Sequence, residues 1–363
     1  MIRKLDARQR RDWLTLARTE TVGPVAFDQL IGRFGSAATA LEAIPELARR
    51  GGRAGALRMP SAAEIDRELD AGEALGAQLL CACEPDFPQA LAALDPPPPL
   101  IWARGDIGLL GRPSVAVVGA RVASAAGQRF ARGLAAELGQ AGLVVVSGMA
   151  RGIDGAAHEG SLATGAVAVL GGGVDDVYPH DHADLYARLV ERGCVVSESP
   201  PGRTATARDF PRRNRIIAGL SRAVVVVEAE LRSGSLITAR LAAEQGREVL
   251  ATPGSPLDPR ARGTNNLLRQ GAAICEGVDD VLRALEGLRD LGEREPRAFP
   301  GPPAEPDAGL LSRVADLLSP TPVSRDEIVR TAAAPAPAVF AALVELSLAG
   351  RAELLPGGLV ARI

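Results

Sequence analysis

Six short apolar runs, rich in valine and bounded by Gly, Ser or Pro, recur through the middle of the chain. They are Val115–Val118, Leu143–Val146, Ala166–Leu170, Cys194–Val196, Ala223–Val227 and Val249–Ala251. Each is too short for a helix, and most are unbroken where a half-exposed strand would alternate, which indicates strands buried on both faces. Helix-like segments of roughly 10–15 residues separate them. The sequence therefore predicts an α/β fold: an extended Rossmann-like, doubly wound and mostly parallel sheet.

The residues that directly follow these strands differ from the strands themselves, because glycines, hydroxyl side chains and charged residues gather there. The six segments are 119–121, 147–151, 171–173, 197–199, 228–230 and 252–254. In an open α/β sheet, ligands bind in the crevice outside the carboxyl ends of the strands, near the point where strand order reverses. We therefore expect the functional site in that crevice.

Smaller segments flank this core on both sides, as expected for a chain of 363 residues. Residues 1–76 show helical patterns at 8–18, 25–34 and 36–47 and predict a helical N-terminal domain. The core spans 77–288, a stiff proline-rich linker spans 289–308, and a C-terminal domain spans 309–363. Within the core, Asp95–Trp102 contains four prolines, so we expect it to be extended and to join the sheet as an edge strand.

A tight turn, Thr21-Val-Gly-Pro24, joins the first two predicted helices. A glycine turn between two short helices can present backbone N–H groups to a phosphate, as in helix-hairpin-helix modules. The same turn also suits a helical domain that binds nothing. The sequence leaves both interpretations open.

The C-terminal domain combines three predicted helices, at 309–318, 324–331 and 335–349, with two short strands around Pro356-Gly-Gly358. This combination is typical of a winged helix. Its third helix, however, contains no Arg or Lys and a single Glu, whereas base recognition needs Arg, Lys, Asn or Gln. We therefore expect the module to be a protein-contact or structural element.

Residue usage excludes several functional classes. The only lysine is Lys4, so the core can contain neither a phosphate-binding P-loop nor a Schiff-base lysine. The first strand–helix turn lacks G-x-G-x-x-G, so NAD and FAD are not supported, and no cofactor is expected. His180 and His182 lie two residues apart with no further ligand, which does not indicate a metal site. The cysteines fit neither a disulfide framework nor a zinc site; they are Cys81, Cys83, Cys194 and Cys275.

Whole-chain properties add little about partners. The chain shows no secretory leader and no apolar run near 18 residues, so we expect a cytoplasmic protein without membrane contact. A net charge of −3 and a pI of about 5.8 give no overall basic field. Aromatic residues make up only 3% of the chain, so few side chains are expected to stack on bases.

The first two strand–helix turns are candidates for anion binding. Arg121 lies on the first turn, before a helix that Ser124 is placed to cap, where the helix dipole favours anions. A structural ion pair is the alternative for Arg121. The second turn, Ser147-Gly148-Met-Ala-Arg151, has glycines near Arg151 that let the backbone approach a ligand. Asp154 can instead pair with Arg151 and cap the next helix.

The segment 203–222 contains six arginines and a single acid, Asp209. On a helix that begins near Arg212, residues 212 and 215 share a face, while Ile216 and Ile217 point to the core. Guanidinium groups are permanently charged and bind phosphates through two parallel hydrogen bonds, and a merely solvated face would mix charges of both signs. The segment therefore predicts polyanion binding, through Arg212, Arg213, Asn214 and Arg215.

Two further turns complete the predicted site. Ser233, Gly234 and Ser235 follow the fifth strand and form a candidate nest of N–H and O–H donors for a phosphate. The third turn supplies Pro179 and His180, which we interpret as a solvent-facing contact. No nucleophile–base pair is visible, and Glu228 and Glu230 are the only acids in the crevice that could serve a hydrolase.

These motifs together resemble the bacterial DNA-processing protein A family (DprA, also called Smf). The resemblance covers about 200 residues in order, and the arginine segment is its most specific part. The matching residues are 115–121 with Ser124, 146–154 with His158, 168–175 with Tyr178-Pro179, Ser197-Glu198, Pro201-Gly202, 210–220, 233–239, Pro253-Gly254, 263–265 and Gly271-Ala272. The N-terminal domain, which is similar to a SAM or helix-hairpin-helix module, and the winged helix also resemble those of the longer members.

The resemblance implies a DNA-binding protein rather than an enzyme. Members bind single-stranded DNA, form dimers through the Rossmann-like domain and help to load a RecA-type recombinase during natural transformation. By position, the DNA contacts would include Arg121, the loop near Pro179 and His180, and Arg212–Arg215. His180 departs from members that carry lysine after Tyr-Pro, and a neutral histidine would weaken that contact or make it pH-sensitive.

The alternative is an enzyme of the lysine-decarboxylase-like group of nucleoside monophosphate phosphoribohydrolases, with Glu228 as the acid/base. Those proteins also carry an arginine, a glycine-rich turn and a glutamate at the strand ends. Their P-G-G-x-G-T-x-x-E segment is absent, and Ser233–Thr238 stands in its place. This difference favours the DNA-binding interpretation.

Overall fold

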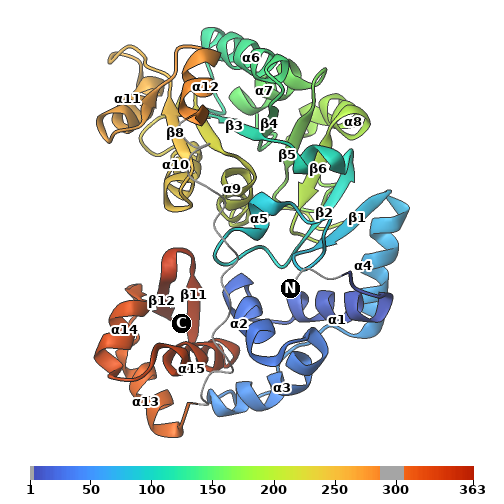
Figure 1. Cartoon of the computed structure of the whole chain (residues 1–363), viewed down its shortest axis with the longest axis vertical. Helices are drawn as coiled ribbons and strands as arrows, with labels where there is room; N and C mark the ends of the chain where they lie inside the picture. The colour runs from blue at the N-terminus through green and yellow to red at the C-terminus, as the bar shows by residue number, and fades with distance from the viewer. Residues whose placement is uncertain (1–3, 287–305) are drawn as a thin grey trace.

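The computed structural model describes residues 4–286 and 306–363, so most of the predicted linker at 289–308 lies outside the described residues. Figure 1 shows the α/β core in the upper half, with the N-terminal helices and the winged helix side by side below it. The fold class predicted from the sequence is confirmed. The N-terminal helices end at Ala74, and the first strand of the core begins at Ala77.

The core is a nine-stranded sheet with the order β1-β2-β6-β5-β4-β3-β7-β8-β9. The seven strands from β6 to β9 in this order are parallel to one another, whereas β2 is antiparallel to both β1 and β6. The strands are β1 (Ala77–Cys81), β2 (Leu100–Gly105), β3 (Ser114–Val118), β4 (Val144–Ser147), β5 (Ala166–Val169), β6 (Cys194–Ser197), β7 (Ala223–Val226), β8 (Glu248–Ala251) and β9 (Ala273–Ile274).

Helices cover both faces of this sheet, which explains why the strand sequences are unbroken valine runs. Alternate strand residues point to opposite faces, so Val115 and Val117 pack under α6 and α7, whereas Ala116 and Val118 pack against α9 and α10. The core helices are α5 (Gln89–Ala92), α6 (Ala125–Gln140), α7 (Ile153–Ser161), α8 (Ala183–Arg192), α9 (Asp209–Leu220), α10 (Gly234–Glu244), α11 (Arg262–Arg269) and α12 (Val278–Glu286).

The strand order reverses at β3, because β4, β5 and β6 continue to one side of it and β7, β8 and β9 to the other. This switch point places the carboxyl ends of β3 and β7 next to each other, as ligand crevices require. The prediction for Asp95–Trp102 was wrong in one respect. Residues 100–105 do join the sheet as β2, but β1 covers their outer side and is itself the edge.

The N-terminal domain consists of α1 (Ala7–Arg18), α2 (Pro24–Phe34), α3 (Ala37–Arg50) and α4 (Ala62–Ala74). Asp6 and Ser61 begin α1 and α4 with capping boxes, which satisfy backbone N–H groups that a helix start leaves free. The domain is fixed to the core as well, since the Trp13 indole Nε1 donates to the Pro99 carbonyl at 2.8 Å.

The C-terminal domain is a winged helix with α13 (Ala308–Leu317), α14 (Arg325–Ala332), α15 (Ala336–Leu348) and the strands β10 (Val323–Ser324), β11 (Ala352–Leu355) and β12 (Leu359–Arg362). One side of α15 packs in the core of its own domain. The other side, with Val344 and Leu348, packs in the hydrophobic cluster of the N-terminal domain. Figure 1 shows α15 beside α2 and α3.

A buried carboxylate marks this contact between domains. Glu345 of α15 is fully buried, and its oxygens lie 3.5 Å from the Arg33 guanidinium and 3.3 Å from that of Arg50. The third helix of the winged helix therefore contacts protein on both sides, as its lack of basic residues indicated. In the described part of the chain, no single helix is long and apolar enough to cross a membrane.

The N-terminal domain also contains a carboxyl group with a perturbed pKa. Burial, with a smaller contribution from the nearby Asp95 carboxylate, raises the pKa of Asp28 in α2 to about 6. The folded protein therefore holds a proton on Asp28 at pH values where the unfolded chain has lost it. Stability contributed by this group is present at low pH and is lost as the pH rises from about 4 to about 6.

We expect Asp28→Asn to stabilise the protein at pH 7.5 by on the order of 1–3 kcal/mol, because it removes a buried charge. Urea unfolding of both proteins at pH 5 and pH 7.5 measures this difference. The gain should shrink toward pH 5, and an equal gain at both pH values would contradict the assignment.

Candidate nucleic-acid interface

The crevice at the switch point is built from the carboxyl ends of core strands and from the helix starts that follow or face them. The turns after β3, β4 and β7 lead into α6, α7 and α10, and α9 runs antiparallel to the strands, so its first turn also lies there. Helix N-termini carry partial positive charge and unpaired N–H groups. The backbone alone therefore makes this region favourable for anions.

Arg213 of α9 lies inside the protein, with 8% of its surface exposed. Its Nη1 donates to the carbonyl oxygen of Gly148 at 2.6 Å and to that of Val169. The guanidinium thus joins the carboxyl ends of β4 and β5. A Cβ at Gly148 would lie 2.7 Å from the guanidinium nitrogens, so a larger residue there would displace the Arg213 side chain.

Burial lowers the pKa of Arg213 to about 10, against the opposing attraction of the Asp154 carboxylate. Asp154 is itself buried, and burial raises its pKa even though it accepts hydrogen bonds from the N–H groups of Gly148 and Ala150. Arg213 is charged at neutral pH, and Asp154 is the acid nearby whose attraction opposes the effect of burial on its pKa. The alternative, a pairing of Asp154 with Arg151, is not found among the described residues, where Arg151 pairs with Asp181 at 2.6 Å.

An aromatic and cationic cluster lies at the start of α9. The Phe210 ring is 5.6 Å from that of Tyr178, and the guanidinium of Arg121 lies 5.5 Å above the Phe210 ring. Tyr178 is 53% exposed, and Arg121 is also exposed. Within the described residues, no hydrogen bond or ion pair occupies the Arg121 guanidinium. This cluster offers one open ring and one available cation.

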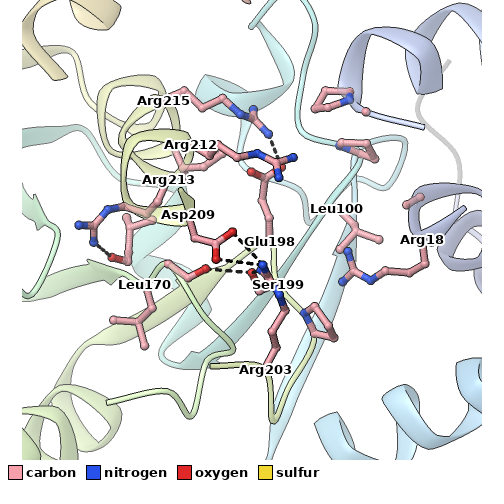
Figure 2. Close-up of a pocket in the computed structure, with 18 of the residues that line it drawn as sticks. Arg18, Leu100, Leu170, Glu198, Ser199, Arg203, Asp209, Arg212, Arg213 and Arg215 are labelled. Carbon is pink, nitrogen blue, oxygen red and sulfur yellow. Dashed lines mark hydrogen bonds and ion pairs between the residues drawn. The ribbon is translucent and has the colours of Figure 1, made fainter. Parts of the chain in front are cut away.

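The remaining arginines of α9 differ in their surroundings. Arg215 is half-buried and pairs with Glu198, whereas Arg212 is exposed and has no hydrogen bond or ion pair in the part of the chain that the structure describes. In Figure 2, Arg212 and Arg215 extend to one side of α9, while Arg213 extends to the other. As expected, Ile216 and Ile217 are buried in the core.

Ser124 caps α6, as expected, and also binds the acid of the neighbouring strand end. Its Oγ accepts from the Gly127 N–H at 2.9 Å and donates to Oε1 of Glu228 at 2.6 Å, while its backbone N–H donates to Oε2 at 2.9 Å. Both carboxylate oxygens of Glu228 are therefore bonded to Ser124. This arrangement joins the turns on the two sides of the switch point.

The serine turn before α10 is folded on itself. Ser233 and Ser235 share a hydroxyl–hydroxyl hydrogen bond of 2.7 Å, and Asn214 donates from Nδ2 to the Gly234 carbonyl at 3.2 Å. Ser235 and Asn214 are buried, Ser233 is half-buried and Gly234 is exposed. The turn is thus tied to α9 through Asn214.

The histidines occupy three different environments. His158 is buried, and burial, with His182 and Arg213 nearby, lowers its pKa to about 3, so it is neutral. His182 lies 3.1 Å from the Met149 carbonyl through Nδ1. His180 is exposed at the start of a short 3₁₀ turn, directly after the buried Pro179. Among the described residues, no group of three His, Cys, Asp or Glu side chains could hold a metal ion.

The structure therefore divides the predicted site residues by exposure. Exposed side chains and backbone that can meet a ligand directly are Arg121, Arg151, His180, Arg212 and Gly234. Partly exposed are Ser124, Arg215 and Ser233. Buried, and thus part of the crevice wall, are Ser147, Gly148, Pro179, Arg213, Asn214 and Ser235. Ser147, for instance, donates its hydroxyl proton to the Val117 carbonyl at 2.7 Å.

Sequence reasoning missed Tyr178 and Phe210 as site residues. Both stood inside recognised motifs, Tyr-Pro and Phe-Pro-Arg-Arg, but the low aromatic content of the chain argued against stacking. The sequence did contain a signal for them. Each of these two motifs, which face the same crevice, includes an aromatic residue.

The fold and the site define a protein with a doubly wound core that contains an arginine-rich crevice, preceded in sequence by a helical domain and followed by a winged helix. Family models match all three parts: DNA recombination-mediator protein A over residues 78–286, a DprA-like N-terminal HHH domain over 7–71 and a DprA winged helix domain over 298–358. The chain belongs to the DNA recombination-mediator protein A (DprA/Smf) family.

Curated relatives agree with this assignment. The chain is 42% identical to protein Smf of Escherichia coli K12 over 281 residues, which cover 75% of this chain and 74% of that protein. It is 38% identical to the DNA processing protein DprA of Bacillus subtilis over 225 residues, covering 61% of this chain and 76% of that one.

Two solved structures are similar. That of DprA from Streptococcus pneumoniae aligns with a TM-score of 0.64 and 29% identity, covering 77% of this chain and 98% of that one. DNA processing protein A from Helicobacter pylori aligns with a TM-score of 0.53 and 29% identity, covering 58% of this chain and 96% of that one, and its structure is described by its single-stranded DNA binding mode.

The neighbouring residues Arg212 and Arg213 allow a matched test of the crevice wall. Arg213→Met leaves the carbonyl oxygens of Gly148 and Val169 without this buried, charged donor and should cost about 3–5 kcal/mol of unfolding free energy. Arg212→Met, one residue away and exposed, should change it by less than about 0.5 kcal/mol. Chemical denaturation measures both. Similar losses for the two variants would show that Arg213 does not hold the strand ends together.

Proposed function

We propose that the crevice binds single-stranded DNA through its phosphates, with little sequence preference. The observation that carries this proposal is a pair of exposed guanidiniums that no described side chain neutralises: Arg121, which lies over the Phe210 ring, and Arg212, two residues after Phe210 on α9. Guanidinium groups at helix starts suit phosphodiesters. The open ring of Tyr178 adds a surface on which one base can stack.

The comparisons support the same proposal. The chain belongs to a family described as DNA recombination mediators, and the similar Helicobacter pylori protein binds single-stranded DNA. The exposed arginines arise from the same stretches by which the chain matches that family. We propose that this protein, too, acts on single strands in DNA processing during natural transformation.

We further propose that a RecA-type recombinase is the partner to which the bound strand is passed, and that the protein works as a homodimer through the Rossmann-like domain. Support for a dimer comes from β9, whose outer side pairs with no strand in the described part of the chain. Ile274 in this strand is 46% exposed. A free strand edge with an apolar side chain is suited to pairing with a second copy.

The alternative, a nucleoside monophosphate phosphoribohydrolase, requires Glu228 as a free acid/base. Both oxygens of Glu228 accept hydrogen bonds from Ser124, and a Cβ at Gly127 would lie 2.6 Å from its carboxyl carbon. The carboxylate is thus used to join two turns and is crowded on one side. This geometry favours the DNA-binding function.

Binding of a labelled single strand across a salt series tests the proposal. We expect the logarithm of affinity to fall with the logarithm of salt concentration at about 0.7 per phosphate contacted, and Arg121→Ala to reduce both the affinity and this slope. Arg192→Ala is the matched control, since this exposed arginine ends α8 directly before β6 begins, at the amino ends of the parallel strands and away from the crevice. Equal effects of the two variants would remove the crevice from consideration.

A second assay separates binder from hydrolase. The purified protein, incubated with nucleoside monophosphates, should release no free base, as followed by chromatography. Base release that is lost in Glu228→Gln would favour the hydrolase and overturn the proposal.

A further inference from the structure

A second cleft, which adjoins the crevice at the start of α9, lies between the core and the N-terminal domain. It has a volume of about 360 Å³, within the range of roughly 300–1,000 Å³ of pockets that take small organic ligands. One wall consists of the first turns of α9 and the segment after β6, and the other consists of the end of α1 and the turn before α2. Figure 2 shows Arg18 facing the arginines of α9 across this cleft.

The lining of the cleft is strongly basic in a chain whose overall charge is negative. Five arginines and two acids line it, Arg18, Arg203, Arg212, Arg213 and Arg215 against Glu198 and Asp209. Four of these arginines are already engaged by Glu68, Asp209, backbone carbonyls and Glu198 respectively. Arg212 is the one with no acceptor among the described residues, and it extends into the cleft.

The opposite wall contains the Thr21–Pro24 turn, for which the sequence left a phosphate-binding and a plain structural interpretation open. Val22, Gly23 and Pro24 line the cleft. Gly23 is the N-cap of α2 and offers no side chain to the helix start, so the N–H groups of the first turn keep their partial positive charge. The turn thus adds to the positive potential that the arginines of the core wall already create.

The cleft and the crevice meet at the start of α9. Arg212 lines the cleft, whereas Phe210, two residues before it, contacts Arg121 and Tyr178 in the crevice. The phosphate backbone of a strand bound in the crevice can therefore continue around the first turn of α9 into the cleft and stay close to positive charge along the way.

We propose that this cleft binds a phosphate-bearing nucleotide of the same single strand that occupies the crevice, with Arg212 as the residue that contacts both parts. This inference rests on the proposed function and extends it, because it makes the N-terminal domain part of the DNA interface. A bound strand then connects the N-terminal domain to the core. The phosphate is either an internal phosphodiester or the terminal phosphate of a strand.

Gly23 permits a test that changes charge and little else. A Cβ at this position would meet nothing within 4 Å, and the backbone, with φ −85° and ψ 178°, is that of an ordinary N-cap. Asp and Asn are both favoured N-cap residues, so Gly23→Asp and Gly23→Asn should both fold. They place side chains of the same shape at the cleft, but only Asp adds a negative charge.

The experiment measures binding of oligothymidylates of increasing length by fluorescence anisotropy at low salt, each with a 5′-hydroxyl or a 5′-phosphate. For long strands, Gly23→Asp should weaken binding about fivefold, as expected for one like charge near a phosphate, whereas Gly23→Asn should bind as the wild type does. Strands too short to leave the crevice should show no difference between the two variants.

The outcomes separate the two proposals. If Gly23→Asp weakens binding of strands with either 5′ end, an internal phosphodiester lies in the cleft. If it weakens binding only of strands with a 5′-phosphate, the strand end lies there. If Arg121→Ala weakens binding but Gly23→Asp and Gly23→Asn bind equally at every length, the cleft inference is wrong and the proposed function stands. If the wild type binds no single strand, the proposed function itself fails.

Discussion

The crevice depends on one buried cation. Arg213 inserts its guanidinium between the carboxyl ends of β4 and β5 and donates to a carbonyl at each of them. A charge in this position is tolerated because Asp154 is close and because the carbonyl dipoles point at it. The two strands pair with each other as far as Ser147 and Ala168, and the guanidinium extends this connection to the residues that follow. The exposed Arg212 is therefore carried by a helix that the buried Arg213 fixes to the strand ends.

Within a single turn, helix α9 provides one arginine that is buried in the structure and one that is exposed to a ligand. Successive residues on a helix point about 100° apart, so Arg213 enters the core while Arg212 faces solvent and the interdomain cleft. The aromatic ring of Phe210 lies between the guanidiniums of Arg121 and Arg213, at 5.5 and 5.9 Å. The ring attracts both cations, and it thereby holds the exposed one in place without neutralising it. This leaves the exposed guanidinium available to a phosphate.

Much of the core could be predicted from sequence, because the six valine runs have one physical explanation, burial on both faces of a parallel sheet. The edge of the sheet was harder to predict. The sequence of β1 is Ala-Gln-Leu-Leu-Cys, and only its pairing with β2 shows that it is the outermost strand. For the site, the sequence located the arginines but not their state of pairing. The partners of Arg213 and Arg215 come from other segments, Gly148, Val169 and Glu198. The cleft requires the placement of the N-terminal domain, which no local pattern encodes.

The packing of α15 against α2 and α3 has a topological consequence. Residues from the two ends of the chain share one hydrophobic cluster, and a Cβ at Gly51 would lie 2.0 Å from the Glu345 carbonyl oxygen, so the backbones are in close contact. Arg53 and Arg351 reinforce the junction by donating to carbonyls across it. The α/β core is thus an insertion into a composite helical body made from both chain ends. The N-terminal domain therefore contacts both of the other domains, and the winged helix, although last in the sequence, packs on the first domain of the chain.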